Sequence, residues 1–562
     1  MSDIKDLKES KGDHHSIRQD DLDKDTVAAV KVVVGDEAFQ QAMLKEPPRP
    51  WSINSLMLYL VVGVGFFCST TNGYDGSLFG TLLSNPNFKD FFHVSNAGAW
   101  TGIVTSMYQI GSVVAIPFIG PAIDTWGRRA GMFIAGSIIV IGVIIQGTCI
   151  ATHSIGQFMG GRFLLGFGVG IIGSSGPTYV VEMSHPAHRG VTTGLYNVFW
   201  PVGAMVATGA ARGGLTYTGN TQWLIPVWLQ MMFPGLIVLL AWFLPESPRW
   251  LYVRGRVVEA QEILTKYHGE GNPNSEWVKL QMMEYETHLE IDGTDRTWWD
   301  YRALFRDRAS RYRLLMNCIV SLFGQWAGNG IVSYYLSKFL DTAGIRGATT
   351  QINVQLGMNA IQIVFAAFGA SQVDRFGRRP MLIFVNIACC FCWIGITVAT
   401  SIANVQEDSS EEYLASVPGP VSKAVLAWVY IFQICYSTGW TPMQALYPVE
   451  VLSFEMRAKG MAFSNLFTSI GLLANQFGVS VALVNIAWKT YVVFTVWCAV
   501  QAGIIWYLVP ETKNRTLEEL DAIFHSKNPR KASTERKKLE LDANANVIHV
   551  DNVETKGLAH IL

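Results

Sequence analysis

Two charged residues lie inside long apolar stretches of the sequence. Asp75 falls within residues 56–83 and Arg162 within residues 155–181, and stretches of about 20 or more apolar residues are typical of helices that cross a bilayer. A charge inside a bilayer is costly and usually functional. Arg162 lies roughly 10 Å along its stretch, and Asp75 lies near the end of its own, so antiparallel helices would bring the two to similar depth. The pair could then act as a proton switch, with a purely structural ion pair as the alternative.

Short motifs that join acids to bases occur twice in the chain. Asp-x-x-Gly-Arg-Arg occupies residues 124–129 and again residues 374–379, and a glutamate followed by Arg occurs in each half as well. The repeated spacing predicts two charge networks, with simple anchoring of the loops by basic residues as the alternative. The expected members are Asp124, Arg128, Glu182 and Arg189 in the first network, and Asp374, Arg378, Glu450 and Arg457 in the second.

Twelve apolar stretches make up about half of the chain; Asp75 and Arg162 lie within them, and the members of the two charge networks lie between them. Of the 562 residues, 50% are hydrophobic and only 15% are charged, whereas a soluble domain carries about 25% charged residues. This composition argues against a soluble enzyme and against a disordered protein. The net charge of −1 leaves no basic field for nucleic acid. The predicted spans are 56–83, 99–121, 131–151, 155–181, 190–211, 224–244, 313–340, 352–372, 380–403, 422–447, 459–485 and 488–508.

The order of the motifs divides the chain into two similar halves. A third motif, Pro-Glu-Ser at 245–247, recurs as Pro-Glu-Thr at 510–512. Two six-span halves in the same orientation are typical of a parallel internal repeat. We therefore predict an all-α integral membrane protein with twelve transmembrane helices in two pseudo-symmetric halves. The expected organisation is a tail at 1–55, a half at 56–244, a linker at 245–312, a second half at 313–508 and a tail at 509–562.

Basic residues indicate the orientation of the chain. Arg and Lys gather in the loops after the second, fourth, eighth and tenth spans and in the linker, whereas the opposite loops hold few. Because basic loops stay in the cytoplasm, we expect both termini to be cytoplasmic. The plasma membrane is the default location.

At this level of detail the sequence resembles the sugar porters of the major facilitator superfamily, over roughly residues 55–525. The resemblance implies the major facilitator fold, short cytoplasmic helices in the linker, and no cofactor. It also implies that the two charge networks latch a cytoplasmic gate, and that an aspartate at position 75 is typical of proton symporters. The motifs that carry it are Gly73-Tyr74-Asp75, the two Asp-x-x-Gly-Arg-Arg loops, Gly161-Arg162-Phe163-Leu164-Leu165-Gly166, Glu182 with Arg189-Gly190, Pro245-Glu246-Ser247-Pro248-Arg249-Trp250-Leu251 and Pro510-Glu511-Thr512-Lys513.

A narrower likeness points to the fungal lactose and cellodextrin permeases. It rests on residues 324–329 (Gly-Gln-Trp-Ala-Gly-Asn), on Ser333-Tyr334-Tyr335, and on residues 441–450. This likeness implies a disaccharide such as lactose or cellobiose. The expected partners are therefore a small sugar, a proton and the lipid bilayer, with no nucleic acid and no obligate protein partner.

A sugar presents hydroxyl groups and apolar ring faces, so its site needs amides, which both donate and accept hydrogen bonds, together with aromatic surfaces. The resemblance places the family's sugar-binding amides at Asn197, Gln325 and Gln362. Amides that bond two helices together are the alternative. The other candidates are Asn329, Tyr334, Tyr335, Trp440, Gln444 and Asn475.

Two positions depart from the pattern of the family. Gly330 stands where the family usually has an asparagine, and Ala445 stands where an aromatic residue is common. Both changes predict a roomier cavity, as a disaccharide would need.

Other classes of protein receive less support from the sequence. The sequence has no P-loop motif, which an ATP-driven pump would need. It also has no paired nucleophile and base of the kind that an enzyme would use. The eight cysteines lack the spacing of a metal site. The expected function is therefore a proton-coupled sugar symporter that works by alternating access. A facilitative hexose uniporter on the same fold remains an alternative, and so does a transporter-like sugar sensor.

Overall fold

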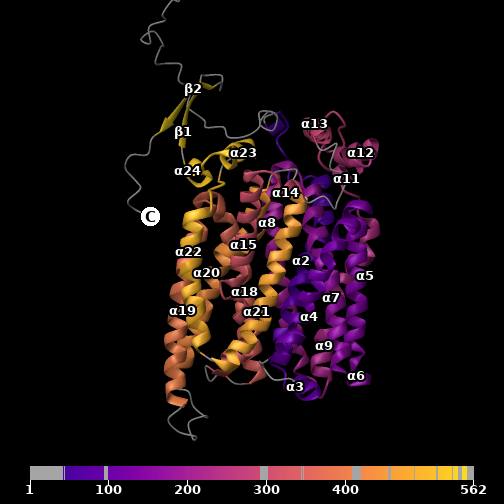
Figure 1. Ribbon diagram of the computed structural model, residues 1–562. Helices are drawn as coiled ribbons and strands as arrows, with labels where there is room; N and C mark the ends of the chain where they lie inside the picture. Colours follow the sequence, from indigo (N-terminus) through magenta and orange to yellow (C-terminus); the bar gives the residue numbers. More distant parts are fainter. Residues whose placement is uncertain are drawn as a thin grey trace, which may run out of the picture. The chain divides into compact units, whose positions relative to one another are not determined.

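The structure of the protein is a computed structural model (Figure 1). The structure describes residues 42–43, 45–93, 99–291, 302–342, 345, 347–407, 419–452, 457–486, 488–513, 517–534, 536–541 and 547–553. The described residues up to 533 form one compact unit, and residues 536–541 and 547–553 belong to a second unit. In the second unit, β1 (Arg536–Leu541) and β2 (Val547–Val553) pair as an antiparallel hairpin.

The first half of the large unit consists of six membrane-length helical segments. Four of them hold proline, at positions 117, 177, 201 and 226, where neighbouring helices can satisfy the freed backbone groups. The segments are α2 (Ile53–Leu82), α4 (Ala99–Gly120) with the π-helical turn Pro121–Thr125, α5 (Arg128–Gly147) with α6 (Cys149–Thr152), α7 (Ile155–Met183), α8 (Arg189–Gly214), and α9 (Thr221–Leu229) with α10 (Met232–Leu240).

The second half repeats this order of segments. The first of them is broken into one long and two short helices, and the other five are continuous. The segments are α15 (Arg308–Trp326) with α16 (Asn329–Tyr334) and α17 (Leu336–Thr342), α18 (Ala348–Phe376), α19 (Arg378–Glu407), α20 (Gly419–Val451), α21 (Arg457–Asn485) and α22 (Lys489–Leu508).

Within the described residues, nine helical segments are long and apolar enough to cross a membrane. The other three predicted spans correspond to α8, the broken α15–α17 and α20, which carry more polar groups. Arg308, Arg311 and Arg313 stand in the first turns of α15, for example. Each of the twelve stretches expected from the sequence is helical.

Short helices lie at one end of the bundle, which we call the linker end; the opposite end, near α3 (Pro86–Phe92) and α6, is the far end (Figure 1). The helices between the halves are α11 (Pro248–Val253), α12 (Val257–Tyr267), α13 (Glu276–Ile291) and α14 (Ala303–Arg306). Beyond α22 the chain forms α23 (Leu517–His525) and α24 (Pro529–Thr534). Leu520, Ile523 and Phe524 of α23 are buried in the core of the second half, so this part of the expected tail is folded.

The linker helices are fastened to the first half. His268 Nε2 lies 3.0 Å from the carbonyl oxygen of Met183, which can only accept, so this nitrogen carries the proton. Gln281 Nε2 then donates to His268 Nδ1 at 2.8 Å. Burial lowers the pKa of His268 to about 4, and the charge of Arg189 acts in the same direction. The histidine is therefore a neutral anchor between α7 and the linker helices.

Residues just before α2 also hold the linker. Trp277 Nε1 donates to the carbonyl oxygen of Glu46 at 2.8 Å, and the Glu46 carboxylate accepts from the backbone N–H of Glu276 at 3.2 Å, at the start of α13. A carboxylate at a helix N-terminus satisfies N–H groups that have no partner within the helix.

Candidate functional site

A small cavity lies between the two halves, near the middle of the bundle. Three helices of the second half and two of the first supply its walls. Its volume is about 10 Å³, roughly the space that one water molecule needs. None of the nine lining side chains carries a charge; they are Ser77, Trp200, Val332, Ser333, Gln355, Met358, Asn359, Gln362 and Gln433.

The polar lining comes mostly from one face of α18. Gln355, Asn359 and Gln362 are spaced by four and three residues, so they share a helix face. Gln433 of α20 joins them, and its Oε1 is buried without a hydrogen-bond partner in the described part of the chain. A buried acceptor without a partner costs free energy, and a ligand hydroxyl would relieve that cost. Of the substrate candidates expected from the sequence, only Gln362 is among the nine lining residues.

Most of the lining was not predicted from the sequence, although the sequence holds a signal for part of it. The spacing of Gln355 and Asn359 with Gln362 is readable as a polar face within an otherwise apolar span, and Gln433 is an amide inside an apolar stretch. Ser77 and Trp200 gave no such signal, because a serine and a tryptophan are common in spans.

The break between α15 and α16 exposes backbone groups beside this cavity. Gly328 has a φ of 103°, a conformation that favours glycine, and a Cβ there would lie 2.3 Å from Trp393. Side chains of the same half satisfy the freed carbonyl oxygens: Trp393 Nε1 donates to Ala327, Tyr436 OH to Gly324 and Asn475 Nδ2 to Gln325, at 3.0, 2.8 and 2.6 Å. Non-helical backbone at membrane depth is tolerated where it is satisfied in this way.

Several substrate candidates meet at this break. Gln325 Nε2 donates to Gln444 Oε1 at 3.3 Å, and Gln444 Nε2 donates to Tyr436 OH at 2.8 Å. Ser333, which lines the cavity, donates to Asn329 Oδ1 at 3.1 Å. The break thus gathers Gln325, Asn329, Gln444 and Asn475 into one polar cluster beside the cavity.

The remaining candidates lie apart from the cavity lining. Trp440, Tyr334 and Tyr335 are buried, with the Tyr335 hydroxyl donating to the carbonyl oxygen of Gln476. Asn197 is half-buried on α8, three residues before Trp200.

The extra room expected at Gly330 is filled. A Cβ on Gly330 would lie 2.7 Å from Asn475 Nδ2, so the Asn475 side chain occupies the space that the missing asparagine leaves. The side chain of Ala445 lies outside the described residues.

Asp75 and Arg162 are both buried, but they do not form an ion pair in this structure. Gln230 Nε2 donates to Asp75 Oδ1 at 3.0 Å, and Asp75 Oδ2 has no partner among the described residues. The Arg162 guanidinium lies over the rings of Phe79 and Tyr108, 4.6 and 5.6 Å from their centroids. The expected pairing is therefore replaced by an amide contact on one side and cation–π contacts on the other.

The first charge network ties α5, α7 and the residues before α11 together. Arg128 Nε donates to Glu182 Oε2 at 2.9 Å and Nη1 donates to Asp124 Oδ1 at 3.3 Å. Ser247 Oγ donates to Glu182 Oε2 at 2.5 Å, and Glu246 Oε1 accepts from the backbone N–H of Arg128 at 3.0 Å. Burial raises the pKa of Glu246, and the N–H donors oppose that shift.

The second network has the same design. Arg378 donates to Glu450 through Nε and Nη2, at 3.0 and 2.6 Å from the two carboxylate oxygens. Thr512 Oγ1 donates to Glu450 Oε2 at 2.5 Å, and Glu511 Oε1 accepts from the backbone N–H of Arg378 at 2.9 Å. Glu511 and Thr512 therefore take the places of Glu246 and Ser247.

The other members expected in the two networks are Arg189, Asp374, Arg457 and Asp124. Arg189 has no hydrogen bond to Glu182, and its Nε is without a partner in the described part of the chain. Instead, the Pro-Glu-Ser motif supplies the missing contacts. The side chains of Asp374 and Arg457 lie outside the described residues. Asp124 is the most exposed acid of the first network.

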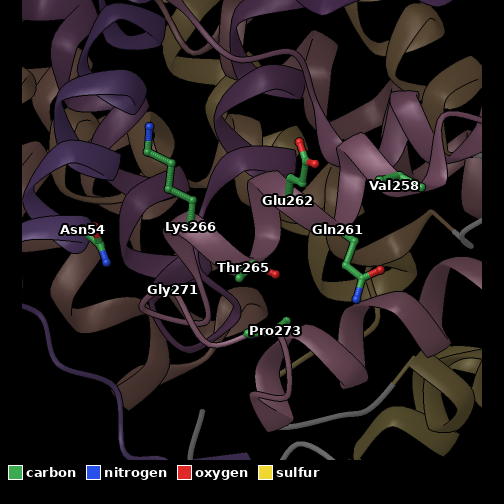
Figure 2. Close-up of a pocket in the computed structure, with 8 residues that line it drawn as sticks. All are labelled: Asn54, Val258, Gln261, Glu262, Thr265, Lys266, Gly271 and Pro273. Carbon is green, nitrogen blue, oxygen red and sulfur yellow. The ribbon is translucent and has the colours of Figure 1, made fainter.

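A larger hollow lies away from the centre, between the start of α2, helix α12 and the loop that follows it (Figure 2). Its volume is about 400 Å³. Thr265 lies near the middle of its lining, with Asn54 and Gln261 on opposite sides (Figure 2). This hollow touches none of the helices that line the central cavity except the first turn of α2, so it is separate from the candidate site.

Two six-helix halves around a polar cavity define a membrane transporter. A sequence model of the family described as sugar (and other) transporter matches residues 61–524. The chain belongs to this family, whose members carry substrates across membranes and are not enzymes.

The relatives carry different substrates. The chain is 28% identical over 485 residues to the high-affinity glucose transporter of Kluyveromyces lactis, covering 83% of this chain and 85% of the relative. It is 24% identical over 495 residues to the quinate permease of Emericella nidulans, covering 86% and 92%.

Solved structures agree on the fold. The proton:xylose symporter XylE bound to 6-bromo-6-deoxy-D-glucose superposes with a TM-score of 0.68 at 20% identity, over 84% of this chain and all of that one. An inward-open form of the xylose transporter XylE from E. coli gives a TM-score of 0.64 at 20% identity, over 83% and 99%. The chain thus has the twelve-helix major facilitator fold.

Proposed function

We propose that this protein is a proton-coupled sugar symporter that works by alternating access. The observation that carries the proposal is the uncharged amide lining of the central cavity, with the unpartnered Gln433 Oε1 inside it. Amides suit a ligand with many hydroxyl groups, because each amide donates and accepts. Trp200 offers an apolar face for a sugar ring.

The lining favours a neutral sugar over a carboxylate such as quinate. A carboxylate brought into a low-dielectric site needs a cation or several donors to replace its water, and the nine lining residues hold no cation. Within neutral sugars, the sequence likeness around residues 324–329 favours a disaccharide such as lactose or cellobiose.

Asp75 is the proposed proton carrier. It is fully buried, and one carboxylate oxygen has no partner among the described residues, an arrangement that suits a carboxyl group holding a proton. Arg162, at cation–π distance from Phe79 one helical turn from Asp75, is the proposed counter-charge when the halves rearrange.

The two charge networks are the proposed gate elements. Each network ties elements of one half at the linker end, and we place that end, with both chain termini, in the cytoplasm of a plasma-membrane protein. A sugar does not fit a cavity of about 10 Å³, so transport requires the halves to separate at one end at a time.

The test is uptake of labelled lactose, cellobiose and glucose by cells that lack their own transporters, at pH 5 and pH 8, with a protonophore. Asp75→Asn removes the proton carrier and keeps the shape. Asp90→Asn is the matched control, because Asp90 is an exposed residue of α3. Unlabelled quinate is the competitor that tests selectivity.

Disaccharide uptake that is faster at pH 5, collapses with the protonophore and is lost in Asp75→Asn alone supports the proposal. Uptake that ignores pH and the substitution makes the protein a facilitative uniporter. Quinate that displaces the sugars contradicts the argument from the uncharged lining. No uptake by protein present at the cell surface points to a sensor.

A further inference from the structure

Hydrogen bonds from α18 cross to the first half on the far-end side of the cavity. Asn359 Nδ2 donates to Thr208 Oγ1 of α8 at 3.0 Å. Thr81 Oγ1 of α2 lies 3.3 Å from Gln355 Oε1, to which it can donate. Nearest the far end, Arg212 Nε donates to Asn353 Oδ1 at 3.1 Å.

These bonds lie at graded depth. Asn359 is about 17 Å from the start of α18 and Gln355 about 10 Å, and both are buried, as are Thr208 and Thr81. Arg212 and Asn353 form an exposed bond. The deepest two bonds therefore use amides that also line the cavity.

We propose that Thr208 and Thr81 form a clasp that competes with the substrate for the amides of Asn359 and Gln355. In the closed arrangement the threonines hold the amides across the interface. When the far end opens, the amides lose these partners and become free to bind substrate hydroxyls. The clasp thus sets how readily the site is exposed at the far end, and it deepens the proposed sugar-binding function.

The two threonines of the clasp differ in the strength of their hydrogen bonds to α18. Thr208 donates to the carbonyl oxygen of Ala204 in its own helix at 2.8 Å, so its oxygen is free to accept from Asn359. The single Thr81 proton is shared between Ser77 O at 3.2 Å and Gln355 at 3.3 Å. Thr208 is therefore the stronger member.

The threonine-to-valine exchange keeps the shape and removes the hydroxyl. Thr208→Val leaves the buried Asn359 donor without an acceptor in the closed arrangement, which shifts the population toward the far-end-open form by about tenfold. Thr81→Val shifts it less. Thr71→Val is the matched control, because the Thr71 hydroxyl donates only to Phe67 O of its own helix at 2.8 Å among the described residues.

Exposure of the cavity is measured directly with Ser333→Cys, which lines the cavity on α16. An impermeant maleimide is added from each side of the membrane in turn, in the Ser333→Cys background with and without the threonine changes. We expect labelling from the far-end side to be about tenfold faster with Thr208→Val, less accelerated with Thr81→Val, and unchanged with Thr71→Val.

Transport gives the second readout. Because the closed form is disfavoured, Thr208→Val should lower the half-saturation concentration from the far-end side and also lower the maximal rate, since the return step requires reclosure. Labelling equal to that of Thr71→Val overturns the clasp. The labelling needs no substrate, so it tests the clasp separately from sugar transport. If Thr208→Val speeds the labelling but the unaltered protein transports no sugar, the clasp is supported and the proposed sugar function is overturned.

Discussion

The two halves of the protein are alike at the linker end and different at the centre. At the linker end, Arg128 with Glu182 and Arg378 with Glu450 have the same geometry, completed by Glu246 and Glu511 at the starts of α5 and α19. The backbone conformation is also the same in the two networks. Gly127 has a φ of 102° next to the Glu246 carboxylate, and Gly377 has a φ of 93° next to the Glu511 carboxylate.

At the centre the first half holds buried ionisable groups and the second holds amides. Asp75 and Arg162 lie in α2 and α7, whereas Gln355, Asn359 and Gln433 lie in α18 and α20. The two charge networks therefore repeat from one half to the other, whereas the buried polar groups at the centre do not.

The largest expected effect comes from removing the central arginine of each charge network, one network at a time. Arg128→Leu removes the arginine that is hydrogen-bonded to the Glu182 carboxylate, whose side chain is 8% exposed, so we expect about 3 to 5 kcal/mol of lost stability. Arg378→Leu should cost less, because the Glu450 side chain is 21% exposed and water can reach it. Thermal unfolding of the two variants in detergent measures the difference; equal losses would contradict the argument from burial.

The second prediction uses the contact of His268 with Met183, which fastens the linker helices to the first half. The pKa of His268 is about 4 in the folded protein against about 6.5 when unfolded. The unfolded state therefore binds the proton first as the pH falls, and stability should drop between pH 6.5 and pH 4, by about 3 kcal/mol at the lower limit. Unfolding measured against pH should lose this slope in His268→Gln, and a slope that persists would assign it to His185 or to another group.

The third prediction concerns the break in the first span of the second half, which begins with α15; the corresponding span of the first half, α2, is continuous. Gly328→Ala places a Cβ against Trp393 at a positive φ, so we expect about 1 to 3 kcal/mol of lost stability. Gly478→Ala in α21 is the control, since nothing lies within 4 Å of its added Cβ, and it should be neutral or slightly stabilising. Similar unfolding temperatures for the two variants would mean that the break adapts to a side chain.

The fourth prediction tests whether the amides at the centre of the second half act separately from the ionisable groups of the first half. Gln433→Leu removes the unpartnered acceptor of the cavity, which should raise the half-saturation concentration for the sugar about tenfold. Its dependence on pH should stay as it was, because proton coupling is assigned to the first half. A changed pH dependence would show that the two functions are not separated between the halves.

The smallest effect is expected at the edge of the interface. Arg212→Gln removes an exposed hydrogen bond to Asn353, and exposed contacts of this kind contribute about 0 to 1 kcal/mol. Sugar affinity and cavity labelling should therefore change less than twofold. A larger change would place the main barrier to opening at the surface rather than at Thr208.

The sequence alone determined the twelve helical stretches, the two halves and the repeated motifs of the two charge networks. Long apolar runs and repeated charged motifs are local in the chain. They predict the helices because an apolar segment inside a bilayer must satisfy its own backbone hydrogen bonds, and a helix does so. Only the tertiary structure decided which side chains meet. It gave Asp75 an amide partner rather than Arg162, filled the space at Gly330 with Asn475, and brought Gln355 and Asn359 to the cavity. Such contacts depend on how helices far apart in the sequence pack together. Spacing along one helix can show a polar face, as it does in α18, but not what that face contacts.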